Sequence, residues 1–129
     1  MSEMEKLTIN LNPVDLGQIE LLVAQGYYAN RAEFIRVAIH DQLAKRTDAV
    51  NEASARRAMV IGAVIHDKRT MEKLRKEGKR LALRVVGLLV IAEDVTPSLA
   101  RDVIESVTVH GVFKASGPVK KALADRMAS

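Results

Sequence analysis

Residues 6–11 alternate strictly between polar and apolar side chains, which predicts a β-strand with one buried face. The apolar positions are Leu7, Ile9 and Leu11, and the polar side chains between them point to the opposite face. A lone strand leaves the N–H and C=O groups along its edges unpaired. We therefore expect this strand to pair with a second strand.

Two amphipathic helices are predicted to follow the strand directly. Asn12 and Pro13 supply the capping residue and the first turn of the first helix, and Gly26 supplies its end. Asn30 is the predicted cap of the second helix, in which apolar residues recur at helical spacing from Phe34 onward. The predicted order is strand, helix, turn, helix.

A unit this small needs a partner, because it cannot bury a strand and two helix faces by itself. A symmetric dimer solves the problem if its two strands pair antiparallel about a twofold axis, with their apolar residues against four helices. The outer face of this ribbon then carries Lys6, Thr8 and Asn10. A two-stranded ribbon fits the major groove, so the expected partners are a second copy and double-stranded DNA.

Residues 4–46 resemble the ribbon-helix-helix family of the CopG, Arc and MetJ type. The resemblance rests on the strand K-L-T-I-N-L, the turn G-Y-Y-A-N-R and the segment R-A-E-F-I-R-V-A-I. That last segment is similar to the family's usual R-S-E-x-I-R-x-A, with Ala32 where serine is common. The resemblance implies a bacterial DNA-binding transcription regulator, for which repression is the expected activity.

The resemblance also implies which residues contact DNA. The outward strand residues would read base edges, for which lysine, threonine and asparagine have suitable hydrogen-bonding groups. The N-terminus of the second helix would hold a backbone phosphate. The expected base contacts are Lys6, Thr8 and Asn10, and the expected phosphate contacts are Asn30 and Arg31.

The second half of the chain contains three similar segments, each an apolar run centred on a glycine. Gly62, Gly87 and Gly111 are spaced 25 and 24 residues apart, and a helical pattern follows each. Such periods are typical of repeat proteins in which strands stack into a parallel sheet with helices on one side. These helices are expected to begin near Thr70, Thr96 and Gly117.

The expected fold class is α+β, with two domains. The alternative for the C-terminal domain is a βαββαβ, ACT-like unit, as in the nickel-responsive members of the family. The expected boundaries are a ribbon-helix-helix domain at 1–48, a linker or helix extension at 49–57, and a solenoid-like β/α repeat domain at 58–129 with an oligomerisation or effector role.

A nickel site is not supported by the sequence. The segment V-I-H-D-K-R around His66 resembles part of the nickel-sensing domain, but the chain has no cysteine and no His-x-His pattern follows. A single histidine there is more typical of a capping or surface residue. We predict no metal, no cofactor and no recognisable pattern for a small-molecule effector.

Charge is distributed unevenly along the chain. The net charge is +4 and the pI is about 9.6, yet residues 1–50 carry a net charge of −2 and the remainder carries +6. The basic excess predicts either a solvated helix face or auxiliary DNA contacts by Lys73, Arg75 and Lys76. Because a dimer has few cations in its DNA-binding half, a homotetramer or larger assembly on adjacent half-sites is a further expectation.

No catalytic constellation is visible, so we do not expect an enzyme. The adjacent Glu93 and Asp94 are interpreted as stabilising the start of the helix at Thr96. The longest apolar run, from Val85 to Ala92, is too short to cross a bilayer, and no secretory signal is recognised. We expect a cytoplasmic protein without a membrane partner.

Two alternative functions remain open from the sequence. The chain could be an assembly or scaffold protein whose C-terminal repeats polymerise while the N-terminal domain only dimerises. It could also be the antitoxin of a toxin-antitoxin pair, although a folded C-terminal unit differs from the usual toxin-wrapping tail. The operator sequence and the regulated genes leave no recognisable pattern in the chain.

Overall fold

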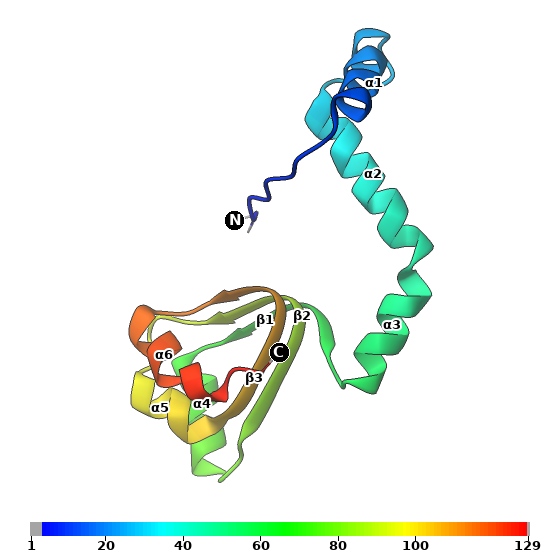
Figure 1. Ribbon diagram of the computed structural model, residues 1–129. Helices are drawn as coiled ribbons and strands as arrows, with labels where there is room; N and C mark the ends of the chain where they lie inside the picture. The colour runs from blue at the N-terminus through cyan, green and yellow to red at the C-terminus, as the bar shows by residue number, and fades with distance from the viewer. Residues whose placement is uncertain (1–3, 129) are drawn as a thin grey trace. The chain divides into compact units, whose positions relative to one another are not determined.

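The computed structural model describes residues 4–128 and combines helices with a three-stranded parallel sheet (Figure 1). Contacts along the chain divide it into two compact units, Met1–Asn51 and Glu52–Ser129. The boundary between them falls inside the stretch that was expected to be a linker or a helix extension.

The N-terminal unit contains α1 (Pro13–Ala24) and α2 (Arg31–Lys45). The side chain of Asn12 accepts a hydrogen bond from the Asp15 amide at 2.9 Å, and that of Asn30 accepts one from the Glu33 amide at 2.8 Å. Both predicted capping residues are therefore confirmed. Each cap satisfies an amide that has no acceptor inside its helix.

A third helix, α3 (Thr47–Arg56), continues the chain after α2. The residue between them, Arg46, departs from helical geometry, with φ −113° and ψ 15°. The Thr47 hydroxyl donates to the carbonyl oxygen of Ala44 at 3.0 Å and closes the end of α2. The stretch after α2 is thus helical as far as residue 56, in a helix separate from α2.

Residues 4–12 belong to neither a helix nor a strand. The predicted strand at 6–11 is not formed in the single chain, because no neighbouring strand lies beside it to complete a ladder of hydrogen bonds. Its apolar side chains remain largely in solvent, with Leu7 82% and Ile9 51% exposed.

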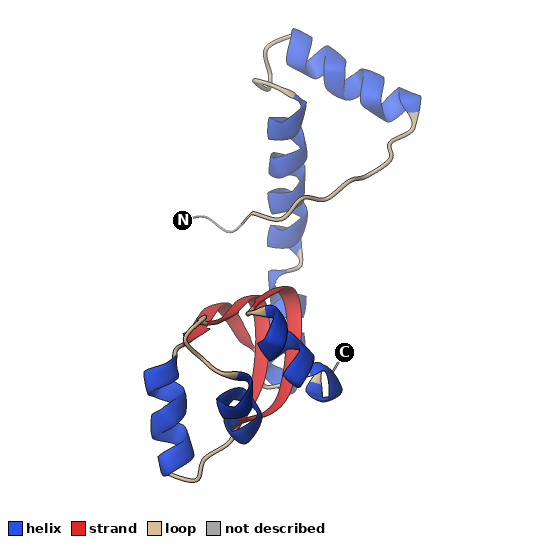
Figure 2. Cartoon of the chain, turned by 90° about the vertical axis from the view of Figure 1, so that its left-hand side faces the viewer, coloured by secondary structure: helices blue, strands red, loops and turns tan. Residues whose placement is uncertain are grey.

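The C-terminal unit is built from strands that alternate with short helices (Figure 2). The sheet order is β1-β2-β3, and all pairs are parallel. Helices α4, α5 and α6 lie against the concave face of the curved sheet (Figure 1). The elements are β1 (Val60–His66), α4 (Lys68–Lys76), β2 (Leu81–Ile91), α5 (Pro97–Val103), β3 (Ile104–Lys114), α6 (Gly117–Ala122) and the 3₁₀ turn η1 (Ala124–Arg126).

The three glycines of the repeat lie in register across the sheet. Gly62 pairs with Gly87, and Gly87 pairs with Gly111. All three have φ between 127° and 135°, a conformation that side chains rarely tolerate, and the strands curve there over the helices. The βαββαβ alternative is wrong, because no two strands within residues 4–128 follow each other without an intervening helix.

The core of the C-terminal unit lies between the sheet and these helices. Its strand residues alternate along β2, so that every second side chain points inward. Each helix contributes at least one apolar residue that is no more than 2% exposed. The central residues are Val85, Leu89 and Ile91 from β2, Met71 from α4, Leu99 and Ala100 from α5, and Val119 from α6.

One of the three predicted helix starts in this unit needs correction. Helix α4 begins at Lys68 rather than near Thr70, because Asp67 is its cap and accepts from the Thr70 amide at 2.9 Å. Helix α6 begins at Gly117, as predicted, and Ser116 is its cap. The cap of α5 is Thr96, as predicted.

The acidic pair before α5 also has a different role from the predicted one. Asp94 accepts a hydrogen bond from the Lys68 amide at 3.1 Å, so it stabilises the start of α4 rather than that of α5. The reason is the parallel register, in which His66 pairs with Ile91. The loop after β2 therefore lies beside the helix that follows β1.

Candidate nucleic-acid interface

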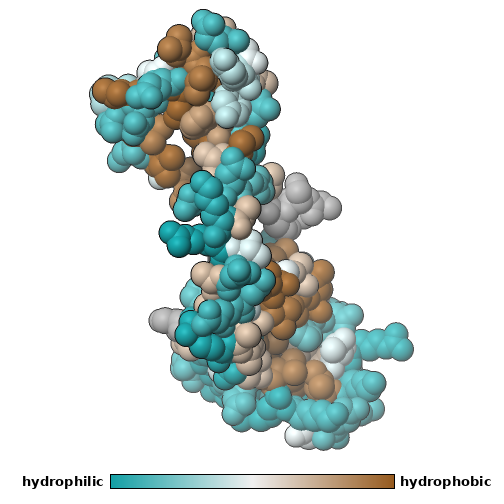
Figure 3. Space-filling model, turned by 90° about the vertical axis from the view of Figure 1, so that its right-hand side faces the viewer, coloured by the Kyte–Doolittle hydropathy of each residue, from teal (hydrophilic) through white to brown (hydrophobic). Residues whose placement is uncertain are grey.

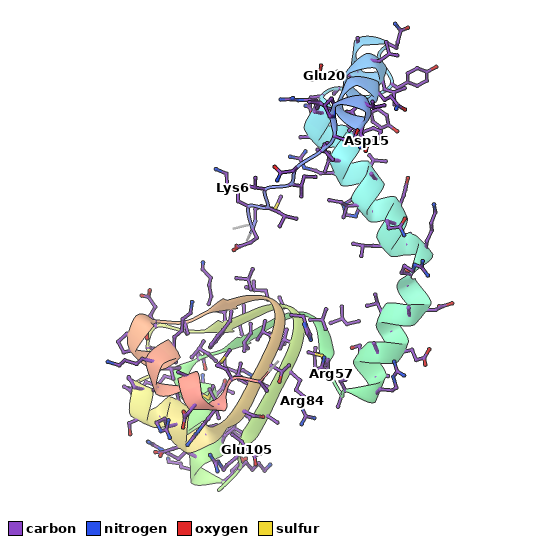
Figure 4. All side chains as sticks on the ribbon, viewed as in Figure 1. Lys6, Asp15, Glu20, Arg57, Arg84 and Glu105 are labelled. Atoms are coloured by element: carbon purple, nitrogen blue, oxygen red, sulfur yellow. The ribbon has the colours of Figure 1, made fainter. Side chains whose placement is uncertain are left out.

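The N-terminal segment separates its apolar side chains from its polar ones. Leu7, Ile9 and Leu11 line an open apolar hollow of about 660 Å³ together with residues of α1 and α2. Lys6, Thr8 and Asn10 do not line this hollow, and all three are exposed. Figure 4 shows the Lys6 side chain on this segment. The two faces predicted for a strand are thus present before any strand pairing.

The apolar hollow is incomplete in the single chain. The helix side of the hollow includes Ile19, Phe34 and Ile35, but Ile39 of α2 remains 48% exposed and Leu11 remains 41% exposed. Hydrophobic side chains are visible on the surface of this unit in Figure 3. A folded monomer rarely leaves so many large apolar groups in one exposed patch, so the surface requires a partner of matching character.

The N-terminus of α2 presents free amides next to a well-formed cap. Asn30 receives the Glu33 amide, and the Glu33 carboxylate in turn accepts from the Ala29 amide. The amides of Arg31 and Ala32 come first in the helix, where no intrahelical acceptor exists. Such a helix start can hold a phosphate oxygen.

Arg31 contacts a residue that the sequence did not indicate. Its Nη1 atom lies 3.6 Å from Oε1 of Glu20 on α1, and both side chains are more than half exposed. An exposed ion pair of this kind contributes at most about 1 kcal/mol. The guanidinium is therefore oriented by Glu20 but remains accessible to an anion.

The auxiliary basic residues lie in the last turn of α4. Lys73, Arg75 and Lys76 are all exposed, while Met71 on the same helix is fully buried. Arg75 forms an ion pair with Asp102 of α5, with 3.4 Å between Nη1 and Oδ2. Two of the three cations remain unpaired by any carboxylate of residues 4–128.

A second basic group was missed from the sequence. Arg56, Arg57 and Arg84 line a hollow of about 400 Å³ together with Thr108, and Figure 4 labels two of these arginines. Arg57 Nη1 lies 3.0 Å from Nε2 of His110. The group depends on the pairing of β2 with β3, which places Arg84 beside Thr108. No local pattern could have indicated it.

The titratable groups with shifted pKa values lie at helix starts and ends of the C-terminal unit. Burial lowers the pKa of His66, and the nearby Asp67 carboxylate opposes this only partly. Hydrogen bonds from Thr70 lower the pKa of Asp67. A hydrogen bond from Arg101 lowers the pKa of Asp125. These shifts have structural causes within the C-terminal unit.

Other kinds of site find no support within residues 4–128. No cluster of three or more histidine, aspartate or glutamate side chains is placed to hold a metal ion there. His110 contacts Arg57, and His66 is partly buried near Asp67. None of the helices in this part of the chain is both long enough and apolar enough to span a bilayer.

Comparison with known proteins gives the family of the chain. A model of the Ribbon-Helix-Helix transcriptional regulator family matches residues 2–120, which covers nearly all of both units. No curated protein and no solved structure matches. Regulators of this family bind DNA, typically as dimers, and are normally not enzymes. The match extends over far more than half of the sequence, which shows that the chain belongs to the Ribbon-Helix-Helix transcriptional regulator family.

Proposed function

We propose that this chain is a sequence-specific repressor in the bacterial cytoplasm that binds operator DNA as a dimer. Residues 6–11 of two copies pair antiparallel, and the resulting ribbon enters the major groove. The observation that carries the proposal is the separation of faces in this segment. Leu7, Ile9 and Leu11 face an incomplete apolar hollow, whereas the polar residues between them face solvent.

The outward residues have the chemistry for reading bases. Lys6 donates to the O6 and N7 atoms of guanine, and Asn10 forms two hydrogen bonds with adenine. Thr8 hydrogen-bonds a base or contacts a thymine methyl group. Because the two copies are related by a twofold axis, the operator is expected to be palindromic or nearly so.

Phosphate contacts fix the position of the ribbon in the groove. The free amides at the start of α2, beside Asn30, hold one backbone phosphate, and Arg31 adds a charge there. Such contacts set the register of the protein on the duplex and carry little sequence information.

Additional cations are needed because the N-terminal half of the chain is acidic. Lys73 and Lys76 on α4 would supply further phosphate contacts. Adjacent dimers on tandem half-sites are the other source of affinity, since each would add its own ribbon and helix contacts.

The proposal is tested by selecting binding sites from fragmented genomic DNA. The wild type and the variant Lys6→Ala/Thr8→Ala/Asn10→Ala are compared, with Asp48→Ala/Asn51→Ala on α3 as a control that also removes exposed polar groups. Dimerisation of each protein is measured by analytical ultracentrifugation. We expect the triple variant to remain dimeric and to enrich no common site. Enrichment of the same sites by the triple variant would place base recognition elsewhere.

A further inference from the structure

Strand β1 forms an edge of the sheet that is apolar and open. Val60, Ile61 and Ile65 are 55%, 51% and 67% exposed, and no charged residue occurs from Val60 to Ile65. Natural edge strands usually carry lysine, proline or a bulge, which prevent another strand from adding to them. Strand β1 has none of these protections.

The opposite edge of the sheet is occupied by the chain itself near the start of β3. Met127 forms a bridge with Val107 of β3, and the Ala128 amide donates to the Val107 carbonyl oxygen at 2.8 Å. No segment within residues 4–128 forms such a bridge with the outer edge of β1. Head-to-tail stacking of copies, which would join β3 to the next β1, is therefore obstructed at Val107. A closed pairing of two β1 strands about a twofold axis is not obstructed in this way.

Gly62 fits a position beside an added strand. A Cβ atom on Gly87 would lie 2.3 Å from the carbonyl oxygen of Gly62. The bond from Cα to such a Cβ atom would therefore point along the sheet from β2 toward β1. Gly62 has nearly the same φ, 135° against 133°. Its own Cβ would project past β1, where nothing lies within 4 Å. Glycine therefore leaves the hydrogen-bonding edge of β1 unobstructed.

We propose that β1 pairs antiparallel with β1 of a second copy, about a twofold axis at Gly62. The two C-terminal units then share one six-stranded sheet. The bends of the two strands coincide in this register, as they do at the Gly62 and Gly87 pair inside one chain. Ile61 lies beside the partner's Ala63 on the outer face, and Val60 lies beside the partner's Val64 on the inner face.

This pairing is independent of the ribbon and of DNA binding. It uses a different surface from residues 6–11, and it buries side chains that an isolated sheet leaves in water. Each chain would then have two self-association surfaces. Because both are closed by twofold symmetry, each accepts one partner strand only.

The test uses disulfide formation in full-length protein, which is convenient because the wild-type chain has no cysteine. The variant Ile61→Cys/Ala63→Cys places thiols opposite each other across the axis. Directly opposed residues in an antiparallel pair have Cα atoms roughly 4.5–5.5 Å apart, within the range of a disulfide. The control Val86→Cys/Leu88→Cys has the same spacing and register level on the central strand β2.

We expect mild oxidation to convert most of the β1 variant, and little of the control, into a covalent dimer on a non-reducing gel. Equal cross-linking of both, or none of the β1 variant, would overturn the proposal. Hydrogen exchange of the wild type gives a check that needs no substitution. Slow exchange of all the amides in residues 60–64 is expected, and fast exchange of every second one would show an open edge and contradict the pairing.

Discussion

Gly87 lies so close to Gly62 that a Cβ atom on Gly87 would come within 2.3 Å of the Gly62 carbonyl oxygen. Gly111 stands in the same relationship to Gly87, at 2.1 Å. Contacts this short are incompatible with a side chain. The repeat of glycines at 25 and 24 residues is therefore a packing requirement of three neighbouring strands that bend together.

The first prediction concerns these glycines. We expect Gly87→Ala and Gly111→Ala each to lower the free energy of unfolding by about 3 kcal/mol or more, because positive-φ strain and a backbone clash add together. Gly117→Ala is the control, since no atom lies within 4 Å of its Cβ position and its φ is not positive. Its effect should stay within about 0.5 kcal/mol. Urea denaturation followed by circular dichroism measures both, and equal stability of Gly87→Ala and the control would contradict the packing argument.

Much of the local structure could be predicted from the sequence. The caps Asn12, Asn30 and Thr96 act through amides only three residues away, so each is encoded in a short stretch. The alignment of Gly62 with Gly87 and Gly111 across the sheet likewise follows from their nearly equal spacing of 25 and 24 residues. Local chemistry and periodicity were sufficient wherever the interacting groups are near each other in the chain or repeat regularly.

What could not be predicted depends on contacts between distant segments. Asp94 accepts a hydrogen bond from the amide of Lys68, 26 residues earlier, because parallel strands bring their ends together. Arg84 joins Arg57 around one hollow because β1, which follows Arg57, pairs with β2 and places Val60 beside Val85. The ribbon that we propose for residues 6–11 is intermolecular, so a single chain cannot form it. Its residues are predicted from sequence pattern and family, and DNA contact by them remains a proposal.

The second prediction is a pH dependence of stability that comes from His66. Its Nδ1 atom is buried without a hydrogen-bond partner among residues 4–128, and burial lowers the pKa of the imidazole below 6.5. Below pH 6.5 the unfolded chain therefore binds a proton that the folded chain does not. The stabilisation is complete above pH 6.5 and is lost as the pH falls toward the lowered value.

The measurement compares wild type with His66→Gln by urea denaturation at pH 7.5 and pH 5.5. We expect wild type to lose more stability than the variant over this interval. His40 and His110 are present in both proteins, so their contributions cancel. The same loss in both proteins would show that His66 is not the group responsible.

The third prediction separates the two possible roles of Arg31. If Arg31 contacts phosphate, Arg31→Gln should weaken binding to operator and to unrelated DNA by similar factors. Glu20→Gln removes the carboxylate 3.6 Å away and should leave affinity unchanged or raise it. Both variants should change stability by less than about 1 kcal/mol, since the pair is exposed. Equal losses of affinity in the two variants would indicate that Arg31 acts only through the ion pair.

The fourth prediction tests the basic turn of α4. We expect Lys73→Ala/Lys76→Ala to reduce the slope of log affinity against log salt concentration by about 0.9 for each DNA phosphate that these lysines neutralise in the wild type. Arg75 is kept, because its ion pair with Asp102 joins α4 to α5. Lys120→Ala/Lys121→Ala on α6 removes the same charge elsewhere. An unchanged slope, or an equal change in the control, would exclude α4 from the interface.

The measurement that tests base reading by the ribbon most directly is the affinity of wild type and Asn10→Ala for the selected operator and for each of its single-base-pair variants. We predict that Asn10→Ala loses about 1–3 kcal/mol of discrimination at one symmetry-related pair of positions and keeps it elsewhere. A uniform loss at every position, or discrimination that remains intact throughout, would contradict the claim that residues 6–11 read the bases.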